Sequence, residues 1–119
     1  MYLKQAFVVS VVALFPAVLA NITCETTDGS PDTSDVTDSI NDLNGMGSDC
    51  PQDNDQKSHC STYASVGSSA IAVCGTDSDM QCSEVGKHAL DIQNECLNFG
   101  KVGGTAHLAS GVRVEVIHS

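Results

Sequence analysis

Two stretches of the chain place hydrophobic residues three or four positions apart, the spacing that puts side chains on one face of a helix. The first stretch predicts a helix over residues 34–44, and the second, longer one predicts a helix over residues 83–98. We expect Gly45 to end the first helix and Gly100 to end the second, because glycine is common after helix C-termini. The apolar positions are Val36, Ile40 and Leu43 in the first helix and Val85, Ala89, Ile92 and Cys96 in the second.

Other stretches predict strands. Residues 21–24 are short and partly β-branched, and residues 60–75 contain two strand-like runs that turn at Gly67. From residue 112 to the C-terminus, valines alternate with polar residues, which is typical of a half-buried strand. The glycine-rich residues 102–105 are interpreted as a flexible connector before this strand.

The predicted order is therefore β-α-β-β-α-β in an α+β fold. The common arrangement for this order is a small disulfide-stapled α/β sandwich, with an antiparallel sheet and two helices on one face. Right-handed crossovers would place the first and third strands side by side in the centre. The alternative is an irregular, cysteine-stapled fold rich in β structure.

The first twenty residues differ from the remainder. Lys4 supplies a positive charge, residues 6–15 are apolar apart from one serine, and small residues precede a cleavage point after Ala20. This pattern is typical of a secretory signal peptide, whereas a membrane anchor needs about 20 apolar residues. We therefore expect residues 1–20 to be a signal peptide and residues 21–119 to be one disulfide-rich secreted, extracellular domain.

Without the first twenty residues, 4 basic residues stand against 15 acidic ones, a formal charge of −11. A nucleic-acid-binding surface needs a basic stripe, so we expect no nucleic-acid partner. We also expect no stable membrane insertion and a monomeric chain. Ile, Val, Leu and Phe supply only 18 of the 99 residues, a fraction close to that of disordered chains. Such a small core needs covalent support.

Six cysteines can supply that support in an oxidising compartment. Zinc binding is disfavoured because no C-x-x-C pair is present. Cys82 and Cys96 would lie about 21 Å apart on one helix, too far for a disulfide. Of the fifteen possible pairings, we expect Cys60–Cys74 across the hairpin, Cys50–Cys82 at the neighbouring helix ends, and Cys24–Cys96 between the first strand and the second helix.

Two patterns are candidates for surface chemistry. Asn21-Ile22-Thr23 is an N-glycosylation sequon, so Asn21 is a candidate glycosylation site. The second helix places titratable side chains at i, i+4, i+7 and i+11, which could form a metal or acid–base face. We interpret this spacing as a solvated helix face, since it follows the helical repeat beside the apolar stripe. Its members are Glu84, His88, Asp91 and Glu95.

Catalytic and metal motifs are not recognisable in the sequence. Residues 53–55 have the composition that opens a calcium loop, but the glycine and the closing glutamate of such a loop do not follow. With every cysteine paired, no thiol nucleophile remains. We therefore expect no enzyme, and no catalytic, metal-binding or cofactor-binding residues.

The motifs "SPDTSD", "AIAVCG", "QCSEVGKHALDIQNEC", "GKVGG" and "VRVEVIHS" stand in order along residues 22–119. This layout resembles the small secreted cysteine-rich proteins of fungi, in particular those similar to killer toxins and to the necrosis-inducing-factor domain of plant-pathogen effectors. The resemblance implies a disulfide-bonded α/β sandwich that is secreted, into the host apoplast if the fungus is plant-associated.

Together, these features predict a non-enzymatic, virulence-associated effector that binds a host or competitor macromolecule outside the cell. One alternative is a secreted inhibitor of a host hydrolase that presents the long acidic loop over residues 45–58. Another is an antimicrobial killer-type toxin, although the basic residues of such toxins find no match in this acidic chain. The sequence does not identify the target.

Overall fold

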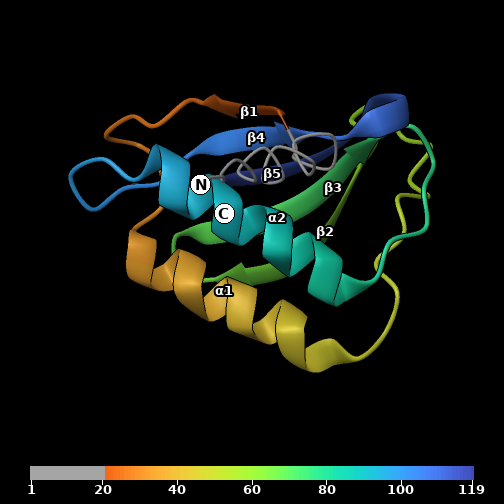
Figure 1. The fold of residues 1–119 in the computed structure, drawn as a ribbon, viewed down its shortest axis with the longest axis horizontal. Helices are drawn as coiled ribbons and strands as arrows, with labels where there is room; N and C mark the ends of the chain where they lie inside the picture. Colours follow the sequence, from red (N-terminus) through yellow and green to blue (C-terminus); the bar gives the residue numbers. More distant parts are fainter. Residues whose placement is uncertain (1–20) are drawn as a thin grey trace, which may run out of the picture.

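The computed structural model describes residues 21–119, which form an antiparallel sheet covered on one face by two helices (Figure 1). The expected signal peptide, residues 1–20, lies outside the described residues. The elements in chain order are β1 (Asn21–Cys24), α1 (Thr33–Met46), β2 (Cys60–Val66), β3 (Ser69–Gly75), α2 (Cys82–Cys96), β4 (Gly104–His107), a short 3₁₀ turn (Ala109–Gly111) and β5 (Val112–His118). The predicted α+β class, with both helices on one face, is confirmed.

The sheet has the order β1-β4-β5-β3-β2, and every neighbouring pair is antiparallel. The expectation that the first and third strands lie together in the centre is wrong. The first strand is an edge strand that pairs with β4, and β5 and β3 lie towards the middle. Helices α1 and α2 pack against each other and over this sheet, as Figure 1 shows.

The glycine-rich segment predicted as a connector leads into an additional strand, β4, so the chain has five strands and not the predicted four. Gly104 lies where β4 passes beneath the end of α2, and a Cβ added there would come within 2.8 Å of the Thr23 carbonyl oxygen and 3.1 Å of the Cys96 sulfur. A side chain at this position would therefore push the strand away from β1. Glycine here permits close strand and helix packing, although its sequence signal resembles that of a flexible loop.

Both helix ends differ slightly from the prediction. Gly45 lies within α1, which continues to Met46 and ends at Gly47, whose φ of 63° is left-handed. Such a conformation is the usual glycine C-cap. Helix α2 begins after Gln81, whose side chain and that of Glu84 form a capping box, and it ends at Cys96. Gly100 therefore belongs to a later turn and does not end the helix.

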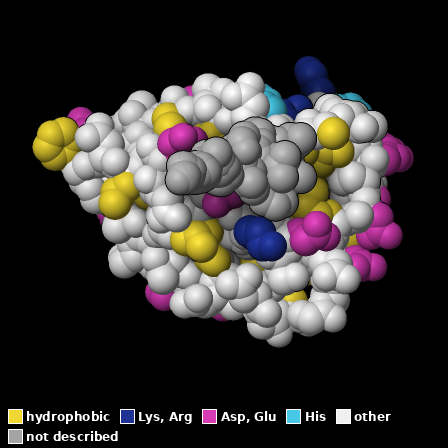
Figure 2. Space-filling view, viewed as in Figure 1, with side chains coloured by type: hydrophobic (Ala, Val, Ile, Leu, Met, Phe, Trp, Pro, Cys, Tyr) yellow, Lys and Arg dark blue, Asp and Glu magenta, His cyan; other side chains and the backbone are white. Residues whose placement is uncertain are grey.

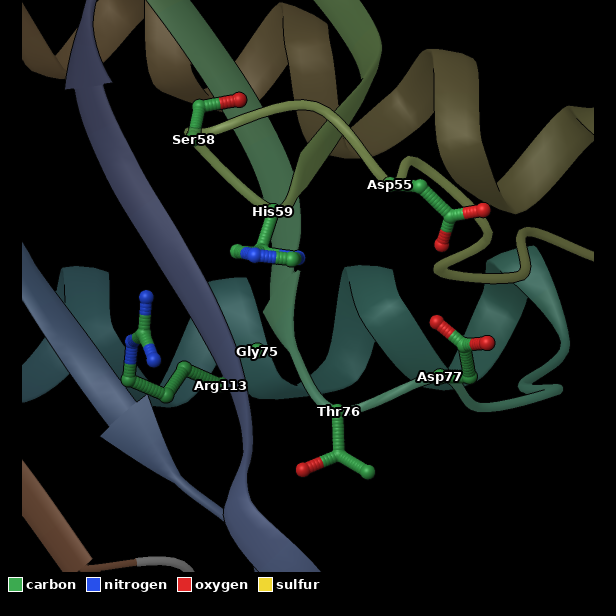
Figure 3. A pocket seen from close by; sticks show the side chains of 7 residues that line it. All are labelled: Asp55, Ser58, His59, Gly75, Thr76, Asp77 and Arg113. Carbon is green, nitrogen blue, oxygen red and sulfur yellow. The ribbon is translucent and has the colours of Figure 1, made fainter.

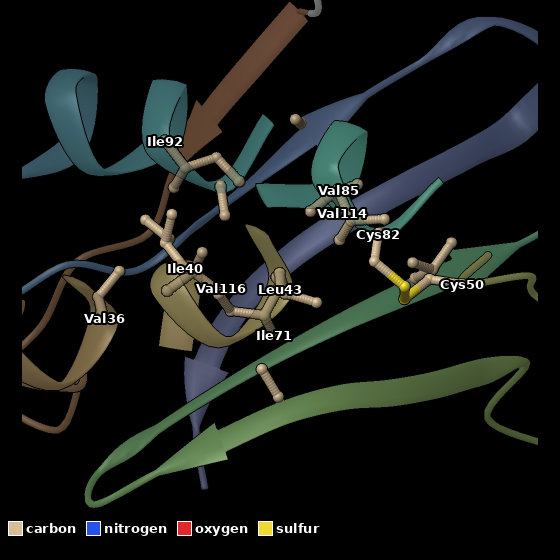
Figure 4. Packing of buried hydrophobic residues seen from close by; sticks show 14 of the residues in the cluster. Val36, Ile40, Leu43, Cys50, Ile71, Cys82, Val85, Ile92, Val114 and Val116 are labelled. Carbon is tan, nitrogen blue, oxygen red and sulfur yellow. A yellow bond between two sulfur atoms is a disulfide. The ribbon is translucent and has the colours of Figure 1, made fainter. Parts of the chain in front are cut away.

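The core lies between the helices and the sheet (Figure 4). The apolar helix positions expected from the sequence are all buried, and they contact alternate residues of β3 and β5. Because side chains alternate along a strand, the residues between these, such as Arg113 and Glu115, lie on the sheet face opposite the helices. The largest core side chains include Val36, Leu43, Val85, Ile92, Ile71, Val73, Val114 and Val116.

Three disulfides close the fold: Cys24–Cys96, Cys50–Cys82 and Cys60–Cys74. These are the three pairs expected from the sequence. Their Cα atoms are 5.2, 4.9 and 4.0 Å apart, respectively. The first bridge joins β1 to the end of α2, the second joins the α1–β2 connection to the start of α2, and the third joins β2 to β3. No cysteine among residues 21–119 is free.

A carboxylate also ties α1 to the β2–β3 hairpin. The Asp35 carboxylate accepts hydrogen bonds from the backbone N–H and the hydroxyl of Ser68, at 2.8 and 2.7 Å. These bonds, with the nearby positive charge of Lys101, lower the pKa of Asp35 below its ordinary value of 3.8. The hairpin turn at Gly67 approaches this carboxylate so closely that a Cβ there would lie 2.5 Å from Asp35 Oδ2.

Candidate functional site

The connection between α1 and β2, residues 47–59, is held against the body of the protein along its first half. We call these residues the pinned loop. The disulfide Cys50–Cys82 fixes it to the start of α2, and the Cys50 N–H donates to the Met80 carbonyl at 2.6 Å. Gln52 and Ser78 exchange two backbone hydrogen bonds, at 2.9 and 3.1 Å. The sequence predicted a loop over residues 45–58; residues 45 and 46 belong to α1, and the contacts show that the path of the remaining residues is fixed.

The side chain of Gln52 holds the pinned loop from within and is only 1% exposed. Its amide nitrogen donates to the carbonyl oxygens of Gly75 and Asn54, at 3.0 and 3.2 Å. Its amide oxygen accepts from the Asn54 N–H at 3.1 Å and from the Ser61 hydroxyl at 2.9 Å. One buried side chain thus satisfies polar groups from β2, from β3 and from the loop itself.

Asn54 and Tyr63 complete this support. The Asn54 side chain accepts from the Gln56 N–H at 2.9 Å and donates to the Cys60 carbonyl at 2.6 Å. The Tyr63 hydroxyl donates to the Pro51 carbonyl, and burial, followed by the charge of Asp53, raises the pKa of Tyr63 above its ordinary value of 10.0. The Asn54 amide therefore positions the loop backbone through its bonds with Gln56 and Cys60.

Beyond Asn54 the loop turns into an exposed tip, residues 55–59, whose five residues are all exposed. His59 adopts a left-handed φ of 50°, an unusual conformation for a residue other than glycine. Two backbone hydrogen bonds hold it there: its N–H donates to the Gln56 carbonyl at 2.9 Å, and its carbonyl accepts from the Gly75 N–H at 2.8 Å. The imidazole is therefore carried on a constrained backbone.

The tip borders a hollow of about 560 Å³ on the rim of the sheet (Figure 3). The loop supplies one wall, the end of β3 and the residues after it supply the floor, and β5 supplies the other wall. Gly75, in the floor, has a φ of 95°, and a Cβ there would overlap the Gly111 carbonyl oxygen, so no larger residue fits. The lining residues are Asp55, Ser58, His59, Gly75, Thr76, Asp77 and Arg113.

The hollow carries charges of both signs. In Figure 3 the His59 ring lies between the Arg113 side chain on one side and the carboxylates of Asp55 and Asp77 on the other. Arg113 Nε contacts Glu115 Oε2 at 3.1 Å, and both side chains are partly exposed. This surface can therefore accept hydrogen bonds from a cation or donate them to an anion.

The hydroxyl groups around the hollow are not arranged as activated nucleophiles in the described part of the chain. The recorded hydrogen bond of the Ser58 hydroxyl is with the Asn54 side chain, at 3.4 Å, and not with His59. A nucleophilic serine requires a base within hydrogen-bonding distance. The arrangement at the tip is therefore suited to binding through charges and hydroxyls.

One group of three potential metal ligands converges within residues 21–119, and it lies next to this hollow. Ligand atoms of Cys60, Cys74 and Glu115 lie within 4.8 Å of one another. Both sulfur atoms are joined in a disulfide, and metal ions bind the thiolate form of cysteine. While the disulfide is intact, the Glu115 carboxylate lies over a covalent bridge rather than over a metal site.

The titratable face predicted on α2 is only partly solvated. Glu84, Asp91 and Glu95 are exposed, as expected, and Glu84 also caps the helix. His88 is half-buried, and its Nδ1 atom has no hydrogen-bond partner among the described residues. Burial lowers its pKa below the ordinary value of 6.5, against the opposing charges of Asp91 and Glu84. This face lies on α2, and none of its residues lines the hollow.

Asn21, the predicted glycosylation site, is exposed at the start of the edge strand β1. It pairs in register with His107, and the hydroxyl of Thr23 lies 3.3 Å from His107 Nε2. Glycosylation at Asn21 stays a prediction.

The acidic character expected from the composition is visible on the surface, where carboxylates are spread over the face seen in Figure 2 and few basic side chains lie among them.

Sequence patterns alone did not single out Gln52 or Arg113. Glutamine in a polar loop carries no burial signal, and only the strand pairing brings Arg113 opposite Cys74 and beside the tip. The spacing of the cysteines was the one indication of this site in the sequence, because Cys50 and Cys60 bracket the loop.

Comparison of the chain with protein-family models, curated proteins and solved structures found no significant match. None of the helices within residues 21–119 has the length and apolar character needed to cross a membrane.

Proposed function

We propose that the protein is a non-enzymatic secreted effector that binds a host or competitor macromolecule outside the cell through the pinned loop and the adjoining hollow. The observation that carries this proposal is the contrast within residues 47–59: a base fixed by a disulfide and by buried Gln52, and a tip that is exposed at every residue.

This contrast favours binding because ordering a loop upon association costs free energy. Each immobilised side chain costs about 0.5–1.5 kcal/mol, and a loop already fixed in the free protein avoids much of that cost. Here the left-handed conformation of His59 and the bonds of Asn54 fix the backbone before any partner arrives. A fixed polar tip supports recognition of a complementary surface.

Secretion is supported by the three disulfides, since such bonds persist in oxidising compartments. The absence of an activated nucleophile at the described hollow supports a non-enzymatic role, and the resemblance to cysteine-rich fungal effectors supports action on a host.

An inhibitor of a secreted hydrolase is the second candidate, and a specific feature favours it. Two disulfides flank the exposed tip: Cys50–Cys82 lies before it and Cys60–Cys74 directly after it. A loop constrained in this way resists distortion when an enzyme cleft closes around it. Inhibition at micromolar concentration across a panel of purified secreted proteases and glycosidases tests this candidate. If no enzyme is inhibited, the inhibitor hypothesis is wrong, and the broader binding proposal is judged by its own experiment.

The binding proposal is tested with a tip variant that combines Lys57→Glu with His59→Gly. Both substitutions alter exposed side chains and preserve the recorded backbone hydrogen bonds, and glycine tolerates the φ of 50° at position 59. The matched control is Lys87→Glu, the same charge change on an exposed residue of α2.

Purified wild type, tip variant and control are infiltrated into leaves of several host genotypes, together with reduced and alkylated protein. We expect a response to the wild type and the control, and a loss of that response for the tip variant. Equal responses to the wild type and the tip variant, or none to either in any genotype, would count against the proposal.

A further inference from the structure

A tight turn projects at the end of the molecule away from the pinned loop. Residues 98–101 connect α2 to β4, and Asn98 and Lys101 exchange two backbone hydrogen bonds, at 2.9 and 3.0 Å. The two residues between them, Phe99 and Gly100, have left-handed φ values of 48° and 77°. Positive φ at both central positions is the pattern of a type I′ turn, in which asparagine, aspartate and glycine are preferred.

Phe99 is an unsuitable residue for this turn and gains nothing from packing. A bulky residue at positive φ is a genuine outlier, and the Phe99 side chain is 97% exposed. Single exposed apolar residues are common and need no explanation. Here the exposed ring coincides with a strained backbone, and conformational strain of this kind concentrates at functional positions.

The turn is held rigidly in place by its base. Lys101 Nζ contacts the Asp32 carboxylate at 2.7 Å, and the Gly100 carbonyl accepts from the Thr33 N–H at 2.9 Å. The disulfide Cys24–Cys96 anchors the chain directly before the turn, and Val102 directly after it is fully buried. The ring is thus displayed on a short, braced support rather than on a flexible loop.

The segments that adjoin the turn carry exposed carboxylates and one further exposed apolar side chain. Leu97, two residues before Phe99, is 51% exposed. Exposed carboxylates come from the adjacent segments, since the Glu25 N–H donates to Gly103 and Asp28 follows in the same connection. Glu95 is exposed in the last turn of α2. The basic residue of this turn, Lys101, is already paired with Asp32.

We propose that Phe99 is the anchor of a second binding surface, which inserts into an apolar pocket ringed by basic side chains on a partner protein. Aromatic anchors that fill such pockets dominate the binding energy of many interfaces. The exposed carboxylates of the adjoining segments and the formal charge of −11 over residues 21–119 argue for a basic partner and against an anionic membrane, where like charges repel.

This surface is separate from the pinned loop. The 15 residues of α2 lie between the start of the helix, where the loop is fixed, and the turn, a span of about 22 Å. Figure 1 shows the α2–β4 connection and the α1–β2 connection at opposite ends of the molecule. The inference goes beyond the proposed function, because the turn and the pinned loop share no residue.

The first test separates folding from binding with Phe99→Asn. Asparagine is well suited to a left-handed turn position, so the variant should keep its three disulfides and melt at the wild-type temperature or about 4 °C above it. A melting temperature clearly below that of the wild type would show that the ring stabilises the fold and would overturn the proposal.

The second test measures binding to purified secreted proteins with isoelectric points above about 9, with acidic secreted proteins as the contrast set. We expect at least one basic protein to bind the wild type with micromolar affinity or better, and Phe99→Asn to weaken that binding at least about 30-fold. Leu90→Gln, which removes an apolar side chain that is 43% exposed on α2, is the matched control and should bind like the wild type.

Three results would overturn the proposal: no binding across the basic set, equal binding by the Phe99→Asn variant, or a preference for the acidic set. Vesicles of phosphatidylcholine with and without phosphatidylserine, and sedimentation of the protein alone, complete the test. Phe99-dependent vesicle binding or Phe99-dependent dimerisation would assign the ring to a membrane or to a second copy instead. The pinned-loop tip variant should bind the basic protein as the wild type does.

Discussion

Replacing Gln52 with alanine removes the side chain that joins the pinned loop to β2 and β3. The variant deprives four polar groups of their partner: the carbonyl oxygens of Asn54 and Gly75, the Asn54 N–H and the Ser61 hydroxyl. Because Gln52 is only 1% exposed, water reaches these groups only if the loop moves away from the sheet.

The loss can be bounded from general values. A buried polar group left without a partner costs about 1–3 kcal/mol, and a made hydrogen bond contributes about 1 kcal/mol net. Partial re-solvation of the four groups through loop movement brings the expected loss to roughly 3 kcal/mol. For a domain of this size, that corresponds to a melting temperature lower by about 12–24 °C.

Two measurements check this prediction. Thermal unfolding of the oxidised Gln52→Ala protein gives the stability change, and hydrogen exchange locates it, since the amides of residues 50–56 should lose protection before those of α1 and β5. Gln56→Ala is the matched control, because Gln56 lies in the same loop and is exposed. A Gln52→Ala protein that melts within about 2 °C of the wild type, or that loses protection uniformly, would refute the idea that this residue pins the loop.

Two further predictions concern covalent and ionic support. Reduction of all three disulfides should unfold the mature chain at neutral pH. The bridges close loops with sequence separations of 72, 32 and 14 residues, and each contributes roughly 3–4 kcal/mol, which in sum is comparable to the stability of a typical domain, about 5–15 kcal/mol. A reduced protein that keeps its helical circular dichroism and melts cooperatively would contradict this prediction. Asp35→Asn should lower the melting temperature near neutral pH, and the gap should close as the pH falls below 3.8, because the lowered pKa of Asp35 means that its stabilising charge is present above that pH and lost on protonation. Asp38→Asn, an exposed residue of the same helix, should leave the acid profile unchanged, and a pH-independent gap for Asp35→Asn would show that its charge is not involved.

The spacing of hydrophobic residues and the distance limits on disulfides were sufficient to predict much of this fold. The i, i+4, i+7 spacing located both helices to within a few residues, because it reflects directly which side of each helix packs on the sheet. The distance along α2 removed the Cys82–Cys96 pairing. The opposed positions of Cys60 and Cys74 in the hairpin, and the expected proximity of Cys50 to Cys82 at the helix ends, then led to the three bridges that the structure shows.

The strand β4 and the edge position of β1 could not be predicted in the same way. Gly103 and Gly104 give the signal of a flexible connector, and only the proximity of Thr23 and Cys96 explains why glycine is required in a strand there. Side-chain pattern describes which face of an element is buried, whereas strand order depends on contacts between residues distant in sequence.

The candidate site was predictable only in outline. The acidic loop between Cys50 and Cys60 was visible in the sequence as a possible recognition element. The burial of Gln52 was not, because a polar residue in a polar segment has no pattern that distinguishes a buried position from an exposed one. Phe99 likewise could be placed on its turn only once the backbone angles were known.

The most direct test of the central claim is a quantitative pull-down from host extracellular fluid with oxidised residues 21–119. The baits are the wild type, the Lys57→Glu/His59→Gly tip variant, and the Lys87→Glu control, with every bait checked for its three disulfides. Proteins enriched by the wild type are then purified and their affinities for each bait measured. The account predicts a partner retained by the wild type and the control and weakened at least about tenfold by the tip variant. A partner that binds all three baits equally, or no partner at all, would contradict binding through the pinned loop.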